Sequence, residues 1–146
     1  MRVHITVSDI LDLSLDVVWQ KLKAFDKFAD FYPAATRSFY LRQTEAGLGS
    51  IRRVEMAEGY VEELLVNIDD QRYRLEYIIL NSTLPLEGYR AEIKLYPISQ
   101  TKGTFIQWQA DFSTSHPDPD IFADEIKKQV FIPAIEGLKH HLSASE

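Results

Sequence analysis

The sequence predicts an α+β domain of one strand, two short helices, six further antiparallel strands and one long C-terminal helix. Three observations support this prediction. The 146 residues fit a single domain spanning 1–146. The middle of the chain alternates apolar and polar side chains, as half-buried strands do. The end of the chain repeats apolar residues at helical spacing, and only that helix is long enough to cover the apolar face of a twisted sheet.

The first elements are a strand and two short helices. Residues 3–11 alternate β-branched and polar side chains, which is typical of a strand. Ser14 stands at the position of a helix N-cap, directly before the apolar stripe of residues 15–25. A second short helix is expected over 27–31. It ends before Pro33, because the residue preceding a proline avoids the α conformation.

Six candidate strands follow between Thr36 and Phe112. The clearest is 89–96, where Tyr89, Ala91, Ile93 and Leu95 share one face and charged residues occupy most of the other. Short segments with turn residues separate the strands, which favours a meander of antiparallel neighbours. The six candidates are 36–42, 50–56, 60–68, 72–80, 89–96 and 103–112.

One long helix is predicted for residues 121–142, about 33 Å in length. The breaker HPDPD (116–120) precedes it, and Asp120 is expected to cap it. Pro133 interrupts the helix and cannot donate a hydrogen bond to the carbonyl of Gln129, which predicts a kink. Its inner stripe comprises Ile126, Val130, Ala134, Leu138 and either His141 or Leu142.

Composition excludes several classes of protein. Apolar residues make up 45% and charged residues 26%, and the net charge of −6 disfavours nucleic-acid binding. The chain has no cysteine, which excludes disulfides, thiolate metal sites and a cysteine nucleophile and fits a reducing compartment. No stretch approaches 18 apolar residues, so we expect no membrane insertion and a cytoplasmic location.

The four histidines lack the spacing of metal ligands, and neither a metal nor a cofactor is expected.

The predicted inner face of the sheet contains polar residues among apolar ones. Arg52 shares its face with Val54, and Glu63 shares its face with Leu65. A buried carboxylate and guanidinium must be paired or hydrated, and buried aromatic hydroxyl or indole groups need partners. Polar groups converging in an apolar concavity are typical of a small-molecule site. The amphipathic aromatic residues expected on this face are Tyr73, Tyr77, Tyr89 and Trp108.

Five segments, in order and at this spacing, extend these local patterns over nearly the whole chain. They are VVWQKLKAFDKFADFYPAATRS (17–38), GLGSIRRV (47–54), VEELLVNIDDQRYRLEYIIL (61–80), LPLEGYRAEIKL (84–95) and FIPAIEGLKHHL (131–142). With them the chain resembles the polyketide cyclase/dehydrase family of the START-like (SRPBCC) superfamily. The resemblance implies a helix-grip fold, also called START-like or birch-pollen-allergen-like. In that fold a seven-stranded antiparallel sheet curls around the last helix and encloses a hydrophobic ligand cavity.

The same pattern is similar to that of the plant abscisic-acid receptors. Arg52 matches their arginine after a Gly-rich turn, and by the same carry-over Glu63, Tyr77 and Tyr89 would line the pocket. Their gate loops are not matched, because Met56 is followed here only by Ala57-Glu58-Gly59 and the second gate is replaced by residues 81–87. A hormone-gated interaction with a phosphatase is therefore not predicted.

The leading functional prediction is the binding of a small hydrophobic or amphipathic partner, such as a lipid, a polyketide or an aromatic metabolite. One alternative is a cofactor-free cyclase, dehydrase or isomerase that uses Glu63 as general acid and base. Another is a ligand-free protein-interaction module similar to the chaperone-activator branch of the superfamily. The Arg52–Glu63 pair either anchors a ligand or serves only as a cross-strand ion pair, and the oligomeric state, homo-oligomer included, is left open. The predicted ligand-binding residues are Arg52, Val54, Glu63, Leu65, Tyr77, Tyr89, Trp108, Ile126, Val130 and Ala134.

Overall fold

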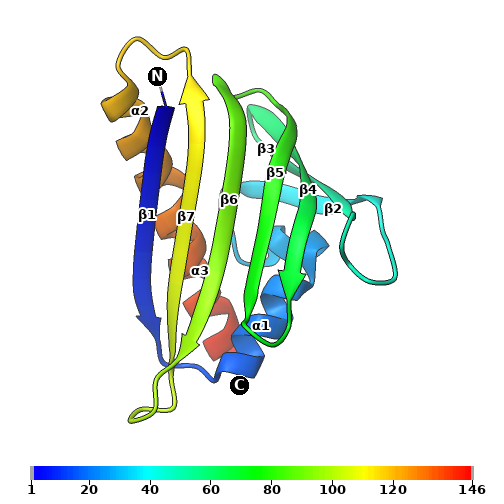
Figure 1. Cartoon of the computed structure of the whole chain (residues 1–146), viewed down its shortest axis with the longest axis vertical. Helices are drawn as coiled ribbons and strands as arrows, with labels where there is room; N and C mark the ends of the chain where they lie inside the picture. Colours follow the sequence, from blue (N-terminus) through cyan, green and yellow to red (C-terminus); the bar gives the residue numbers. More distant parts are fainter. Residues whose placement is uncertain (1, 146) are drawn as a thin grey trace.

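A computed structural model describes residues 2–145 and shows a curved sheet with the C-terminal helix behind it (Figure 1). The chain begins with strand β1 (Arg2–Leu11), helix α1 (Leu15–Lys23) and a short 3₁₀ helix (Phe25–Asp30). Ser14 caps α1 as predicted, since its Oγ accepts a hydrogen bond from the Val17 amide. The other strands are β2 (Ala35–Arg42), β3 (Ile51–Met56), β4 (Gly59–Asp69), β5 (Arg74–Ser82), β6 (Leu86–Pro97) and β7 (Thr104–Thr114).

The seven strands form one antiparallel sheet in the order β1-β7-β6-β5-β4-β3-β2. Strands β2 to β7 make the predicted meander, and β1 joins it along β7. The face alternation predicted for 89–96 is confirmed, because Tyr89, Ala91, Ile93 and Leu95 are all buried. Strand β7 alternates in the same way and places Trp108 in the centre of the core. The apolar side of the sheet therefore faces the last helix.

One aromatic residue departs from the predicted strand pattern. Tyr73 precedes β5 rather than lying within it, and its positive φ of 54° marks a turn. Its ring packs edge-on against Trp19 of α1, with the ring centroids 5.8 Å apart. The expectation that Tyr73 belongs to the same strand as Tyr77 was therefore wrong, although its ring does pack against the core.

The long helix has three parts: α2 (Pro119–Ile126), a π-helical turn (Lys127–Phe131) and α3 (Ile132–Ser145). Asp118, not Asp120, caps it, because the Asp118 carboxylate accepts a hydrogen bond from the Ile121 amide at 3.2 Å. Pro119 then occupies the start of the helix, where its missing N–H costs nothing. The predicted start at residue 121 was thus two residues late. Among residues 2–145, no helix has the length and apolar character needed to cross a membrane.

The kink at Pro133 stays a prediction; the structure shows a π turn over Lys127–Phe131, which ends two residues before that proline. The Ile132 amide donates to the carbonyl of Lys127, five residues back, instead of to the residue four back. Pro133 has no N–H to donate to the carbonyl of Gln129. That carbonyl accepts a hydrogen bond from the Tyr32 hydroxyl at 3.0 Å instead. The short segment after α1 therefore supplies the partner that the helix itself lacks.

A glycine lets that segment approach the helix closely. A side-chain carbon at Gly137 would overlap the carbonyl oxygen of Phe31. Only glycine fits here without a shift of the backbone. This close approach places Phe28 and Tyr32 beside the helix and at the edge of the space beneath the sheet.

Candidate functional site

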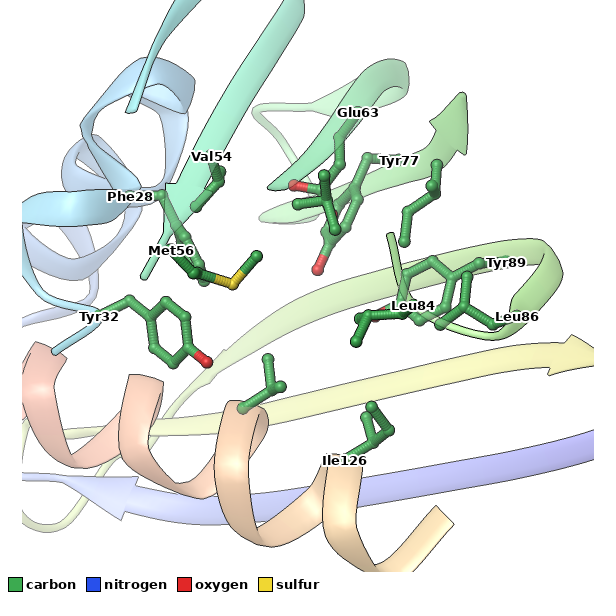
Figure 2. A pocket seen from close by; sticks show the side chains of 13 residues that line it. Phe28, Tyr32, Val54, Met56, Glu63, Tyr77, Leu84, Leu86, Tyr89 and Ile126 are labelled. Carbon is green, nitrogen blue, oxygen red and sulfur yellow. The ribbon is translucent and has the colours of Figure 1, made fainter. Parts of the chain in front are cut away.

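A cavity lies between the sheet and the helix, beneath strands β3 to β6 (Figure 2). It has a volume of about 50 Å³, counted as the space that the centre of a water molecule can reach. That is room for roughly three to five water molecules, since one needs about 10–15 Å³ by this measure. Its walls are formed by Phe28, Tyr32, Val54, Met56, Val61, Glu63, Tyr77, Ile79, Leu84, Leu86, Tyr89, Ile126 and Val130.

The cavity lies where two strands of the sheet separate. Strands β5 and β6 pair only from Arg74 with Lys94 to Ile78 with Arg90. Beyond that point β5 continues along β4, and β6 continues along β7 with a register shift around Gly88, whose φ is 62°. An extra residue in a strand bends it and increases its twist. The two strands therefore diverge toward their connecting segment, and the side chains there do not fill the space completely.

Arg52 and Glu63 form a buried ion pair beside the cavity. They lie opposite each other on β3 and β4, with only 4% and 6% of their surfaces exposed. Arg52 Nε donates to Glu63 Oε1 at 2.8 Å, and Arg52 Nη1 donates to the carbonyl of Phe25 at 3.0 Å. Such charges can be buried because each has a partner of opposite charge and further hydrogen bonds. The sequence-based placement of both residues on the inner face is confirmed.

The two members of the pair face different spaces. The guanidinium carbon of Arg52 lies 3.9 Å from the ring centre of Phe25, 4.6 Å from that of Phe28 and 5.0 Å from that of Tyr77. Arg52 lines a second void of about 10 Å³, room for roughly one water molecule. It does not line the larger cavity, whereas Glu63 does. The carboxylate is thus the member of the pair that a molecule in the cavity would meet.

Two tyrosines add hydroxyl groups to the wall. Trp108 Nε1 donates to the Tyr77 hydroxyl at 3.2 Å, and Figure 2 shows that hydroxyl pointing toward the space beside the helix. Burial raises the pKa of Tyr77, and the negative charge of Glu63 raises it further. Burial likewise raises the pKa of Tyr89. Both hydroxyls therefore keep their protons at neutral pH and can both donate and accept hydrogen bonds.

Six of the ten predicted ligand-binding residues line the cavity: Val54, Glu63, Tyr77, Tyr89, Ile126 and Val130. The other four, Arg52, Leu65, Trp108 and Ala134, are buried in the surrounding core. A role in ligand binding stays a prediction for all ten. Among residues 2–145, no three histidine, aspartate or glutamate side chains are grouped so that they could hold a metal ion.

Sequence reasoning missed part of the wall. Phe28 lies in the short 3₁₀ helix and Tyr32 lies two residues beyond its end, while Leu84 lies in the connection between β5 and β6 and Leu86 begins β6. The usable signal for Phe28 and Tyr32 was their aromatic character and not their spacing, because the helix is of the 3₁₀ type and ends at Asp30, before Tyr32. Leu84 and Leu86 carried no comparable signal, since their positions depend on how far the two strands diverge.

The chain shares its sequence pattern and its fold with known proteins. It belongs to the family described as polyketide cyclase / dehydrase and lipid transport, whose family model matches residues 2–142. The sequence matches no curated protein. Its arrangement of sheet and helix confirms the helix-grip fold that the resemblance implied.

Solved structures share this fold over nearly their full lengths. XoxI from Bacillus cereus superposes with a TM-score of 0.81 at 20% identity, covering 96% of this chain and 95% of that one. A protein from Bacillus thuringiensis gives 0.81 at 21% identity, with 97% and 99% covered. Ara h 8.0201 also gives 0.81, at 18% identity and with 99% of both chains covered. At these identities the likeness concerns the fold.

Proposed function

We propose that the protein binds a small, mostly apolar molecule, such as a lipid, a polyketide or an aromatic metabolite, in the cavity between sheet and helix. The observation that carries this proposal is an apolar cavity whose wall includes a buried carboxylate and three buried tyrosines. Apolar walls with few convergent polar groups are the general form of small-molecule sites. Membership in a family described by lipid transport as well as cyclase chemistry points the same way.

The size of the cavity bears on the alternative of a ligand-free interaction module. A space smaller than a few water molecules would have favoured that alternative, and the space here, with room for roughly three to five, lies at that limit. It is also only about a third of the roughly 150 Å³ that holds benzene in an engineered cavity. A ring-sized ligand must therefore displace part of the wall. Met56, Leu84 and Leu86 are the partly exposed apolar side chains best able to move.

The test is to recover small molecules from the protein purified under native conditions, by mass spectrometry, and to measure thermal stabilisation by a panel of apolar compounds. Val61→Phe should fill the cavity and abolish both effects, because Val61 lines it. Val66→Phe, on the same strand but outside the cavity wall, should leave both effects in place. Binding that survives Val61→Phe unchanged would contradict the proposed site.

A second candidate is catalysis without a cofactor, in which Glu63 moves a proton of the bound molecule. It is favoured by one observation: Glu63 is the charged side chain in the cavity wall, and the Tyr77 and Tyr89 side chains share that wall. A carboxylate beside hydroxyl donors could take a proton next to a carbonyl while the hydroxyls stabilise the resulting oxyanion. Glu63→Gln should then abolish turnover of a recovered ligand without abolishing its binding. Unchanged turnover would exclude this role.

A further inference from the structure

The charges around the cavity restrict what it can bind. Among the residues of its wall, Glu63 alone carries a charge, and that charge is negative. Arg52 Nε bonds Glu63 Oε1, and a carboxylate has lone pairs on both of its oxygens, so Glu63 can accept a further hydrogen bond from a molecule in the cavity that it lines. A carboxylate accepts hydrogen bonds but donates none. The wall therefore presents an acceptor that a donor group on the ligand would satisfy.

The nearest cation is not available to a ligand. Arg52 is bound to the Glu63 carboxylate and to the Phe25 carbonyl, and its guanidinium lies over the rings of Phe25 and Phe28. Arg52 lines the smaller void and not the cavity wall, so an anionic ligand in the cavity would meet the Glu63 carboxylate and not the guanidinium. Removing one partner of a buried ion pair leaves an uncompensated charge and costs far more than a surface contact returns.

The pair as a whole is neutral, so any charged ligand would leave one charge uncompensated in an apolar space. A carboxylate would add a second negative charge beside Glu63, and an ammonium ion would add a positive charge that Arg52 opposes. The Tyr77 and Tyr89 hydroxyls are buried and keep their protons at neutral pH, so they offer hydrogen bonds without net charge. The wall thus favours an uncharged, partly polar molecule over either ion.

We propose that the ligand is a neutral apolar molecule with a hydroxyl group that donates to Glu63, and that a carboxylate on the same apolar frame is excluded. This inference rests on the proposed function and narrows it to one chemical class. It differs from the expectation that Arg52 and Glu63 anchor a ligand together, because the structure turns Arg52 toward the smaller void.

The experiment compares three small aromatic probes that differ in one substituent: p-cresol, toluene and p-toluate, with binding measured by calorimetry at pH 7. We expect p-cresol to bind at least tenfold more tightly than p-toluate and severalfold more tightly than toluene. Equal or tighter binding of p-toluate would overturn the inference while leaving the proposed function intact. Equal binding of p-cresol and toluene would overturn the hydroxyl requirement. Failure of all three to bind would contradict the proposed function and the inference with it.

Variants of the ion pair give a second test. Glu63→Gln leaves the Arg52 cation uncompensated, so p-toluate should gain at least tenfold relative to p-cresol. The double variant Arg52→Met with Glu63→Gln removes both charges. This double variant should lose most of the preference for p-cresol over toluene. It also replaces the single variant in the test if Glu63→Gln alone does not fold. Glu62→Gln is the matched control, since Glu62 pairs with Arg53 and is not part of the cavity wall. Unchanged selectivity in both ion-pair variants would overturn the inference.

Discussion

Arg52 is buried together with its charge, yet its side chain does not line the proposed ligand cavity. Its guanidinium is satisfied by a carboxylate from β4, a backbone carbonyl from the short helix and the faces of aromatic rings. Alternation in the sequence placed Arg52 and Glu63 on the inner face correctly. It could not show which of the two meets the cavity, because that depends on Phe25, a residue 27 positions away along the chain.

Breaking the pair should be costly, whereas replacing it should not. We expect Arg52→Met to lower the free energy of unfolding by about 3–5 kcal/mol, because the Glu63 carboxylate would remain buried without its partner. Adding Glu63→Leu to the same protein should recover at least half of that loss. Urea unfolding of the wild type, the two single variants and the double variant measures the coupling. A single variant as stable as the wild type would show that the pair is not buried as described.

The buried tyrosines predict a dependence of stability on alkaline pH. The pKa values of Tyr77 and Tyr89 are raised above the ordinary value of about 10, so the folded state holds these protons more tightly than the unfolded chain does. Their contribution to stability is fully present below about pH 10. It is lost progressively as the pH rises above that value, where the unfolded chain ionises first.

Chemical unfolding measured between pH 8 and pH 11 checks this dependence. The double variant Tyr77→Phe, Tyr89→Phe should lose stability less steeply over that range than the wild type. Tyr96→Phe, at a residue that is 40% exposed, should follow the wild-type slope. Identical slopes for all three proteins would mean that water reaches the two hydroxyls freely.

At the scale of elements, the C-terminal helix depends on a segment far from it in the sequence. Pro133 indicated an irregular position in this helix, because proline lacks the N–H that an α-helix needs there. The sequence could not show that the helix would widen into a π turn or that Tyr32 would bond the Gln129 carbonyl. The cap was misplaced for a local reason: two aspartates lie within three residues, and Asp118 is the one that leaves Pro119 at the first helical position.

Tyr32→Phe removes the hydrogen bond that holds the π turn. We expect a loss of about 1–2 kcal/mol in the free energy of unfolding, because the Gln129 carbonyl would lose its donor. Hydrogen exchange at the amides of residues 130–132 should become faster than in the wild type. Tyr96→Phe again provides the exposed control. Unaltered exchange in Tyr32→Phe would show that the turn is held by the helix alone.

At the scale of the whole molecule, the order of elements and the presence of a cavity were predictable, and the size of the cavity was not. The alternating strands, the single long helix and the five family-like segments were enough to predict the sheet that curls around the helix. The volume of the cavity depends on how far β5 and β6 diverge and on the side-chain conformations of wall residues such as Leu84, Leu86 and Met56. A cytoplasmic location, the lack of nucleic-acid binding and the ligand roles of individual residues stay predictions.

The central claim is that the helix leaves an accessible apolar space beneath the sheet. Methyl nuclear magnetic resonance under xenon pressure tests it most directly, since xenon enters empty apolar cavities. Saturable shifts should appear at the methyl groups of Val61, Ile79 and Ile126, which line the cavity, and not at Leu11 or Leu95, which are buried but do not line it. Shifts at none of these methyl groups, or equal shifts at Leu11 and Leu95, would contradict the account.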